Sequence, residues 1–76
     1  MELVWENRGR VRAKVGDKEA LVGGEAMLAG DPDFVVYSDY LKSWSDGTPL
    51  VGEERAKFLE DLVQEASRRG WKFEVE

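Results

Sequence analysis

The last third of the chain has the clearest alternation of hydrophobic and polar positions. From Glu53 to Arg69, apolar side chains recur every three or four residues, which predicts an amphipathic helix over 53–69. Gly70 follows directly and predicts where the helix ends. Residues 71–76 then alternate strictly between apolar and charged side chains, as in a half-buried strand. A one-sided helix and a one-sided strand bury their apolar surfaces against each other, so this segment predicts a helix packed on a sheet.

The beginning of the chain predicts a β-hairpin. Residues 3–5 and 10–15 form its strands, and we expect a three-residue loop at 7–9, in which Gly9 supplies a positive φ. In this register Glu6, Val4 and Glu2 lie opposite Arg10, Arg12 and Lys14 on one face of the hairpin, and the apolar pairs Trp5–Val11 and Leu3–Ala13 share the other face. A two-residue loop would instead place Glu6 opposite an apolar residue, so the three-residue loop is preferred.

A third strand is predicted at 19–22, after a turn at 16–18, so the first three strands form a meander. The sequence does not decide which side of this strand faces the core. Either Ala20 and Val22 or Leu21 and Gly23 can face it. We expect the Gly23-Gly24 pair to be a flexible turn. A short connection at 25–29 follows, either as an edge strand or as one helical turn.

Residues 34–37 are apolar on both sides, which predicts a strand that lies centrally or has one exposed apolar face. The chain can then turn back into a further strand over 40–44, which the turn residues of 45–49 end. We therefore predict a single α+β domain of residues 1–76. Its antiparallel sheet has five to six strands, five before the helix and one after it, and the single helix covers one face.

The composition excludes several kinds of chemistry. The chain has no cysteine and no histidine, which removes disulfide frameworks and the usual pairs of nucleophile and base. Carboxylate pairs are too common among 16 acidic residues to indicate catalysis, and their spacing does not match a calcium-binding loop. We expect no enzymatic activity, no cofactor and no bound metal.

No apolar run reaches the length of a membrane span and no signal-peptide pattern is present, which predicts a cytoplasmic protein.

The net charge of −5 is concentrated in the middle of the chain. Residues 21–50 contain five acidic side chains and one basic one, which gives −4. This bias disfavours nucleic acid and favours a basic protein surface as the partner. Because one helix covers only one face of the sheet, we expect aromatic side chains of this region to be exposed beside the carboxylates. The predicted partner-binding residues are Asp31, Asp33, Tyr37, Asp39, Tyr40, Trp44 and Asp46. The alternative is that the three aromatic residues belong to the core.

Several short sequences follow one another in a characteristic order from Gly24 onward. They are Gly24-Glu25, Phe34-Val35-Val36-Tyr37, Leu41, Trp44, the acidic start of the helix and the closing strand. This order resembles immunity protein family 74 of the bacterial polymorphic toxin systems, over roughly residues 23–76. The family commonly has Thr or Ser where this chain has Val51-Gly52. The resemblance implies a small α+β protein that neutralises a cognate protein toxin by stoichiometric binding.

Two other functions stay open at this point. The first is a structural or adaptor module that associates with itself through the uncovered face of the sheet, as a weak homodimer. The second is nucleic-acid binding through a basic ribbon formed by Arg8, Arg10, Arg12 and Lys14. The acidic net charge argues against this second function, and we expect the ribbon to be neutralised across the strands by Glu2, Glu6 and Glu19.

Overall fold

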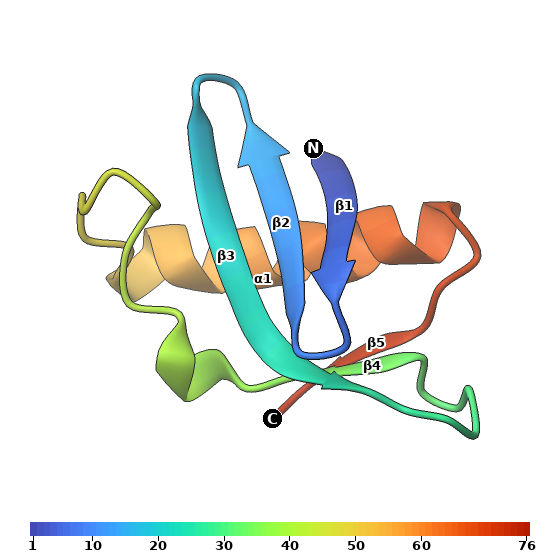
Figure 1. Ribbon diagram of the computed structural model, residues 1–76. Coiled ribbons are helices and arrows are strands. Elements are labelled where there is room, and N and C mark those ends of the chain that lie inside the picture. The colour runs from blue at the N-terminus through green and yellow to red at the C-terminus, as the bar shows by residue number, and fades with distance from the viewer.

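The computed structural model describes residues 1–76 and contains one sheet and one α-helix. In chain order the elements are β1 (Glu2–Asn7), β2 (Arg10–Val15), β3 (Lys18–Ala26), β4 (Phe34–Val36), a 3-10 helix η1 (Ser38–Tyr40), α1 (Gly52–Arg68) and β5 (Phe73–Val75). The strands lie in the order β1-β2-β3-β4-β5. Helix α1 crosses behind β1, β2 and β3 and leaves the other face of the sheet, here called the open face, toward the viewer (Figure 1). The α+β class, the single covering helix and the five-stranded sheet are confirmed.

The register of the first hairpin agrees with the prediction along most of its length. Leu3 lies opposite Ala13 and Trp5 opposite Val11. The turn is tighter than expected, because Asn7 pairs with Arg10 and the register shifts after Trp5 in a bulge. Gly9 does not adopt a positive φ. Its N–H instead donates to the side-chain oxygen of Asn7 at 2.8 Å, which closes the turn.

Strand β3 is the longest strand and connects the two parts of the sheet. Its first half pairs with β2, and this pairing selects the register in which Ala20 and Val22 are buried and Leu21 faces outward. Its second half pairs with β4. In Figure 1 β3 bends between these halves, so that β4 and β5 lie across the lower end of the first three strands.

The prediction that Gly23-Gly24 forms a flexible turn is wrong, because both residues lie inside β3. Gly24 pairs with Val36, and β4 comes very close at this point. A Cβ atom on Gly24 would lie 2.0 Å from the carbonyl oxygen of Val35 and 2.7 Å from the ring of Phe34. The glycine is required for the close approach of two strands and not for a turn.

The predicted strand over 40–44 is also wrong, as is the fully antiparallel sheet. Strand β4 has β3 on one edge and β5 on the other, so no edge remains for a hairpin partner. The pairing of β4 with β5 is parallel, because α1 forms a crossover that returns the chain in the same direction. Residues 38–40 form η1 instead, and the segment after it has one isolated bridge, between Ser43 and Pro49.

The core lies between α1 and the covered face of the sheet. The helix contributes a buried stripe of Phe58, Leu62 and Ala66, spaced four residues apart. At one end of the core, the ring of Trp5 contacts three other aromatic rings edge-on, with centroid distances of 5.4 to 5.6 Å. Two of these rings, Trp71 and Phe73, come from the end of the chain. Trp5 belongs to β1 and Phe73 to β5, so these aromatic contacts hold the two edge strands of the sheet toward each other.

Helix α1 begins and ends within one residue of the predicted bounds. At its end, Gly70 has a φ of +81°, and the N–H of Trp71 donates to the carbonyl of Ala66 at 2.9 Å, as in a glycine-terminated helix. At its beginning no side chain caps the backbone, in keeping with Val51-Gly52 in place of Thr or Ser. The helix is neither long enough nor apolar enough to cross a membrane.

The close approach at Gly24 gives a prediction about stability. We expect Gly24→Ala to lower the free energy of unfolding by about 3 kcal/mol, because the added methyl group overlaps backbone that cannot move without separating β3 from β4. Gly23→Ala is the matched control, since its nearest neighbour would be Tyr40 at 3.6 Å, an ordinary contact. Urea denaturation of both variants measures the difference. Equal stability of the two would contradict the proposed constraint.

Candidate functional site

Two tyrosines and three carboxylates gather beside the open face, where β4 ends opposite the middle of β3. We call this group the tyrosine–carboxylate patch, and its members are Glu25, Tyr37, Asp39, Tyr40 and Glu76. The hydroxyl of Tyr37 donates to Glu25 at 2.8 Å, and the two tyrosine rings meet edge-on with centroids 6.1 Å apart. Tyr37, Tyr40, Asp39 and Glu76 line an open hollow of 390 Å³. Tyr40 is 74% exposed.

Backbone hydrogen bonds fix the position of this patch. Tyr37 follows β4 directly, and its N–H donates to the carbonyl of Gly23 in β3 at 3.0 Å. The N–H and the hydroxyl of Ser38 both donate to the carbonyl of Glu76, at 3.0 and 2.8 Å. These bonds bring the residues after β4 together with the residue after β5, although they are far apart in sequence.

Arg55 of α1 holds η1 in place from the opposite side. Its Nε donates to the carbonyl of Leu41 at 3.0 Å, and its Nη2 donates to the carbonyl of Ser38. No carboxylate lies within ion-pair distance of this guanidinium. The guanidinium therefore satisfies backbone carbonyls at both ends of the short turn that displays Asp39 and Tyr40. Arg55 is a positioning residue for the patch.

The patch has an uncompensated negative charge. Glu25, Asp39 and Glu76 form no ion pair with any lysine or arginine. The pKa of the Tyr37 phenol is raised above its ordinary value, first because it donates a hydrogen bond to Glu25, and further because of partial burial and the negative charges of Glu25 and Glu76. Tyr37 therefore stays a neutral hydrogen-bond donor well into alkaline solution.

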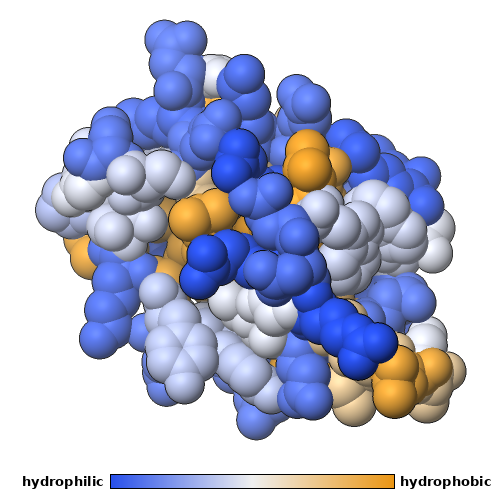
Figure 2. All heavy atoms as spheres, viewed as in Figure 1, coloured by the Kyte–Doolittle hydropathy of each residue, from blue (hydrophilic) through white to orange (hydrophobic).

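A second hollow, of 450 Å³, lies on the other side of the two tyrosines. Its floor is the backbone of Gly23 and Gly24, and its walls include Arg10 and Leu21. The prediction that Glu2, Glu6 and Glu19 neutralise the basic ribbon is correct only for Arg12, which pairs with Glu6 and Glu19. Arg8, Arg10 and Lys14 form no ion pairs. In the view of Figure 2, which faces the same way as Figure 1, hydrophilic side chains cover most of the open face.

The other predicted acidic residues lie elsewhere, where they hold loops in place. Asp33 accepts a hydrogen bond from the N–H of Lys72 at 2.7 Å, and Asp31 binds the ammonium group of the same lysine at 2.9 Å. Asp46 accepts the N–H of Thr48 at 2.8 Å and so closes the turn at 45–49. Hydrogen bonding to Thr48 also lowers the pKa of the Asp46 carboxyl. The structure thus does not bring Asp31, Asp33 and Asp46 into the patch.

Trp44 lies in the core. It is 5% exposed, its ring packs edge-on against Phe58 at 5.4 Å, and the ammonium group of Lys18 lies 5.3 Å from its ring centre. Glu25, Glu76 and Arg55 were not predicted from the sequence. The pairing of Glu25 with Val35 places this glutamate beside Tyr37, but that register depends on Gly24 being inside a strand.

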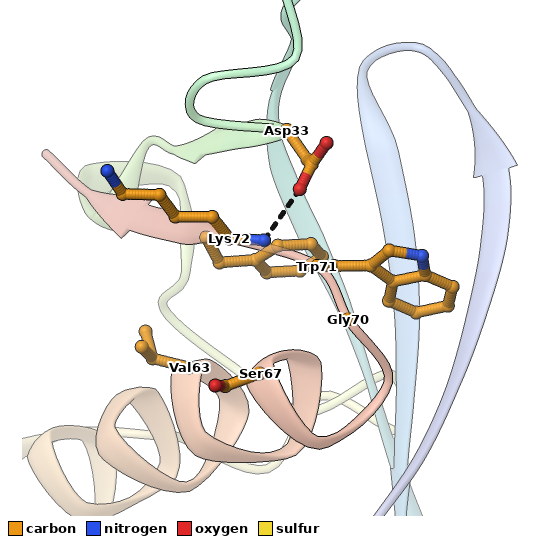
Figure 3. Close-up of a pocket in the computed structure, with 7 residues that line it drawn as sticks. Asp33, Val63, Ser67, Gly70, Trp71 and Lys72 are labelled. Atoms are coloured by element: carbon orange, nitrogen blue, oxygen red, sulfur yellow. Dashed lines mark hydrogen bonds between the residues drawn. The ribbon is translucent and has the colours of Figure 1, made fainter.

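A third feature is a groove of 490 Å³ between α1 and the start of β5. Val63 and Ser67 of α1 form one wall, and the chain from Gly70 to Phe73 forms the other. Figure 3 shows both helix residues directed toward the strand, with Asp33 hydrogen-bonded to the backbone of Lys72 above them.

The single-helix α+β fold displays exposed Tyr40 against half-buried Tyr37, beside carboxylates without ion-pair partners, and aromatic residues of this kind are common in protein interfaces. The family model of immunity protein 74 matches residues 5–76, so the chain belongs to this family of toxin-immunity proteins. The resemblance found in the sequence is confirmed and extends through nearly all of the first hairpin. Comparison with curated proteins and comparison with solved structures gave no match.

The environment of Tyr37 gives a prediction about its ionisation. In a Tyr40→Phe variant, Tyr37 is the only tyrosine, and its tyrosinate absorbance can be followed alone. We expect its pKa to lie above the ordinary value, and Glu25→Gln to lower it toward that value by removing the acceptor carboxylate and its charge. Because the folded state has the raised pKa, its stabilising effect is complete below the ordinary tyrosine pKa and is lost as pH rises through the folded value. An unchanged pKa in Glu25→Gln would contradict the Tyr37–Glu25 hydrogen bond.

Proposed function

We propose that the chain neutralises a cognate protein toxin by binding it stoichiometrically through the tyrosine–carboxylate patch. The observation that carries this proposal is the contact between exposed Tyr40 and half-buried Tyr37, surrounded by three carboxylates without ion-pair partners. Because the chain belongs to a family of immunity proteins, the partner that we propose is a protein toxin.

The chemistry of the patch favours a basic surface on the toxin. Glu25, Asp39 and Glu76 attract lysine and arginine side chains, and the negative potential increases the rate of encounter. The tyrosine rings supply apolar contact area with little loss of conformational freedom, and arginine side chains also stack on such rings. Inhibition in this mechanism results from occlusion or distortion of the toxin's active site and requires no reaction by the chain.

The anchoring of the patch supports a preformed surface. Hydrogen bonds to Gly23, Glu76 and Arg55 fix the segment that displays Tyr37, Asp39 and Tyr40. A surface that is already ordered loses less conformational entropy when it binds. Asp31, Asp33 and Asp46 stay candidates for the rim of a larger interface, since each is held on a surface loop.

Growth rescue is the direct test of the immunity function. The gene immediately upstream is expressed in a bacterial host with and without this chain, and cell density is followed. We expect growth to stop when the upstream gene is expressed alone and to recover on co-expression. Toxicity that this chain does not relieve would contradict the proposed function.

Charge reversal tests the location of the interface. We expect Asp39→Lys combined with Glu76→Lys to slow association with the toxin about tenfold at low ionic strength, because both substitutions replace attraction by repulsion. Stopped-flow or surface-binding kinetics with the purified toxin measures the rate.

The matched control is Asp17→Lys combined with Glu60→Lys, which changes the net charge equally at exposed positions away from the patch. Neither control residue forms an ion pair. If both double variants associate equally slowly, the effect comes from net charge alone and the patch is not the interface.

A further inference from the structure

The connection between β3 and β4 has three consecutive exposed apolar side chains. They are Met27, Leu28 and Ala29, here called the apolar turn, and Leu28 is 92% exposed, the highest value among the large apolar side chains. In Figure 2 hydrophobic spheres gather at the lower right, where Figure 1 places this connection. Turn positions are usually occupied by polar residues, glycine or proline, and exposed apolar runs are avoided on surfaces that have no binding function. The apolar turn therefore requires an explanation.

The fold itself does not require the leucine. Leu28 belongs neither to the hydrophobic core nor to the apolar side chains packed against it. Backbone groups alone close the turn, because the N–H of Gly30 donates to the carbonyl of Met27 at 3.1 Å and Gly30 has a φ of +74°. A polar side chain in place of Leu28 would leave this hydrogen bond intact, so packing and turn geometry do not explain the residue.

Hydrogen bonds anchor the apolar turn to the residues that lead into β5. The N–H of Met27 donates to the carbonyl of Asp33 at 3.0 Å, and the N–H of Asp33 donates to the carbonyl of Lys72 at 2.8 Å. The carboxylate of Asp33 accepts the N–H of Lys72 at 2.7 Å, and Asp31 binds the ammonium group of the same lysine. An apolar side chain displayed on an anchored turn loses less conformational entropy when it binds.

The register of β3 and β4 places the apolar turn beside the tyrosine–carboxylate patch. Ala26 lies opposite buried Phe34 and packs against the core. Because side chains alternate along a strand, Glu25 and Met27 lie on the other face, where Glu25 accepts the hydroxyl of Tyr37. Two residues of a strand span roughly 7 Å, so the apolar turn continues the patch, and both fit within one interface of ordinary size.

The shape and charge of these surroundings define the occupant. A single leucine on a turn is too small to hold the chain on a lipid surface, and the net charge of −5 opposes approach to anionic lipids. In a symmetric dimer formed through this turn, two exposed turns would meet, and neither could enclose the other's Leu28. A protein bound at the patch, in contrast, already lies next to Met27 and can enclose the leucine.

We propose that Leu28 inserts into an apolar pocket of the protein partner that binds the tyrosine–carboxylate patch, with Met27 and Ala29 at the rim of the contact. This inference rests on the proposed function and adds an apolar pocket, next to basic residues, to the surface of the toxin. The two parts of the interface act at different steps. The carboxylates attract the toxin before contact and increase the association rate, whereas Leu28 is buried only in the complex and slows dissociation.

Binding kinetics with the purified toxin tests this division. We expect Leu28→Ser to raise the dissociation rate about tenfold or more and to leave the association rate within about twofold, at low and at high ionic strength alike. Leu28→Met keeps an apolar side chain of similar volume, and we expect it to dissociate nearly as slowly as the unmodified chain. Urea denaturation verifies that Leu28→Ser is as stable as the unmodified chain.

The matched control is Val51→Ser. Val51 is 62% exposed and lies at the start of α1, outside the apolar turn. Serine is a favourable residue at the start of a helix, so the control variant folds. We expect its dissociation rate to be unchanged, which would separate the effect of Leu28 from a general loss of exposed apolar surface.

Three outcomes would overturn the inference. The first is a Leu28→Ser variant that dissociates from the toxin at the unmodified rate. The second is sedimentation of the chain with phosphatidylcholine vesicles that Leu28→Ser abolishes, which would assign the turn to a membrane. The third is concentration-dependent self-association that Leu28→Ser abolishes, which would assign it to a second copy of the chain. Each of these leaves growth rescue by the unmodified chain in place, whereas the absence of rescue would contradict the proposed function and this inference together.

Discussion

The position of β4 between β3 and β5 is the constraint on which the rest of the structure depends. Phe34 and Val36 are fully buried, so this short strand needs neighbours on both edges and a helix over one face. The β3 edge is available only because Gly24 has no side chain where the Val35 carbonyl and the Phe34 ring approach. The β5 edge is filled by a parallel strand that α1 returns to the sheet. The bend of β3 and the crossover helix both follow from this central position.

The same constraint produces the exposed surface. With both edges of β4 occupied, the residues that follow it cannot continue as a hairpin and leave the sheet as a 3-10 turn. A turn of this kind leaves carbonyl groups without strand partners, and Arg55 supplies donors to two of them. The aromatic and acidic residues of the turn are consequently displayed in a fixed orientation. The geometry needed for the core thus also fixes the surface that we propose for binding the toxin.

Local sequence patterns predicted those features that depend on local physics. The apolar stripe and Gly70 located the helix, and the alternation of charged and apolar residues set the register of the first hairpin. The patterns failed at Gly24 and at 40–44, where the decisive contacts are distant in sequence. A glycine that permits close approach looks the same in sequence as one that permits a turn. Leu41 and Trp44 are buried in the core without being in a strand. Of the predicted site residues, the structure brings together Tyr37, Asp39 and Tyr40, while Glu25 and Glu76 could be found only from the sheet topology.

The acidic residues divide into two groups with different physical roles. Asp31, Asp33 and Asp46 accept hydrogen bonds that hold loops, so their charges are already partly compensated within the chain. Glu25, Asp39 and Glu76 form no ion pair with a lysine or arginine and lie around the two tyrosines. Uncompensated charges that repel one another reduce the stability of a small domain. A partner that supplies the missing positive charge removes this repulsion when it binds. In the proposed complex, basic groups of the toxin would therefore complete the charge balance of the patch.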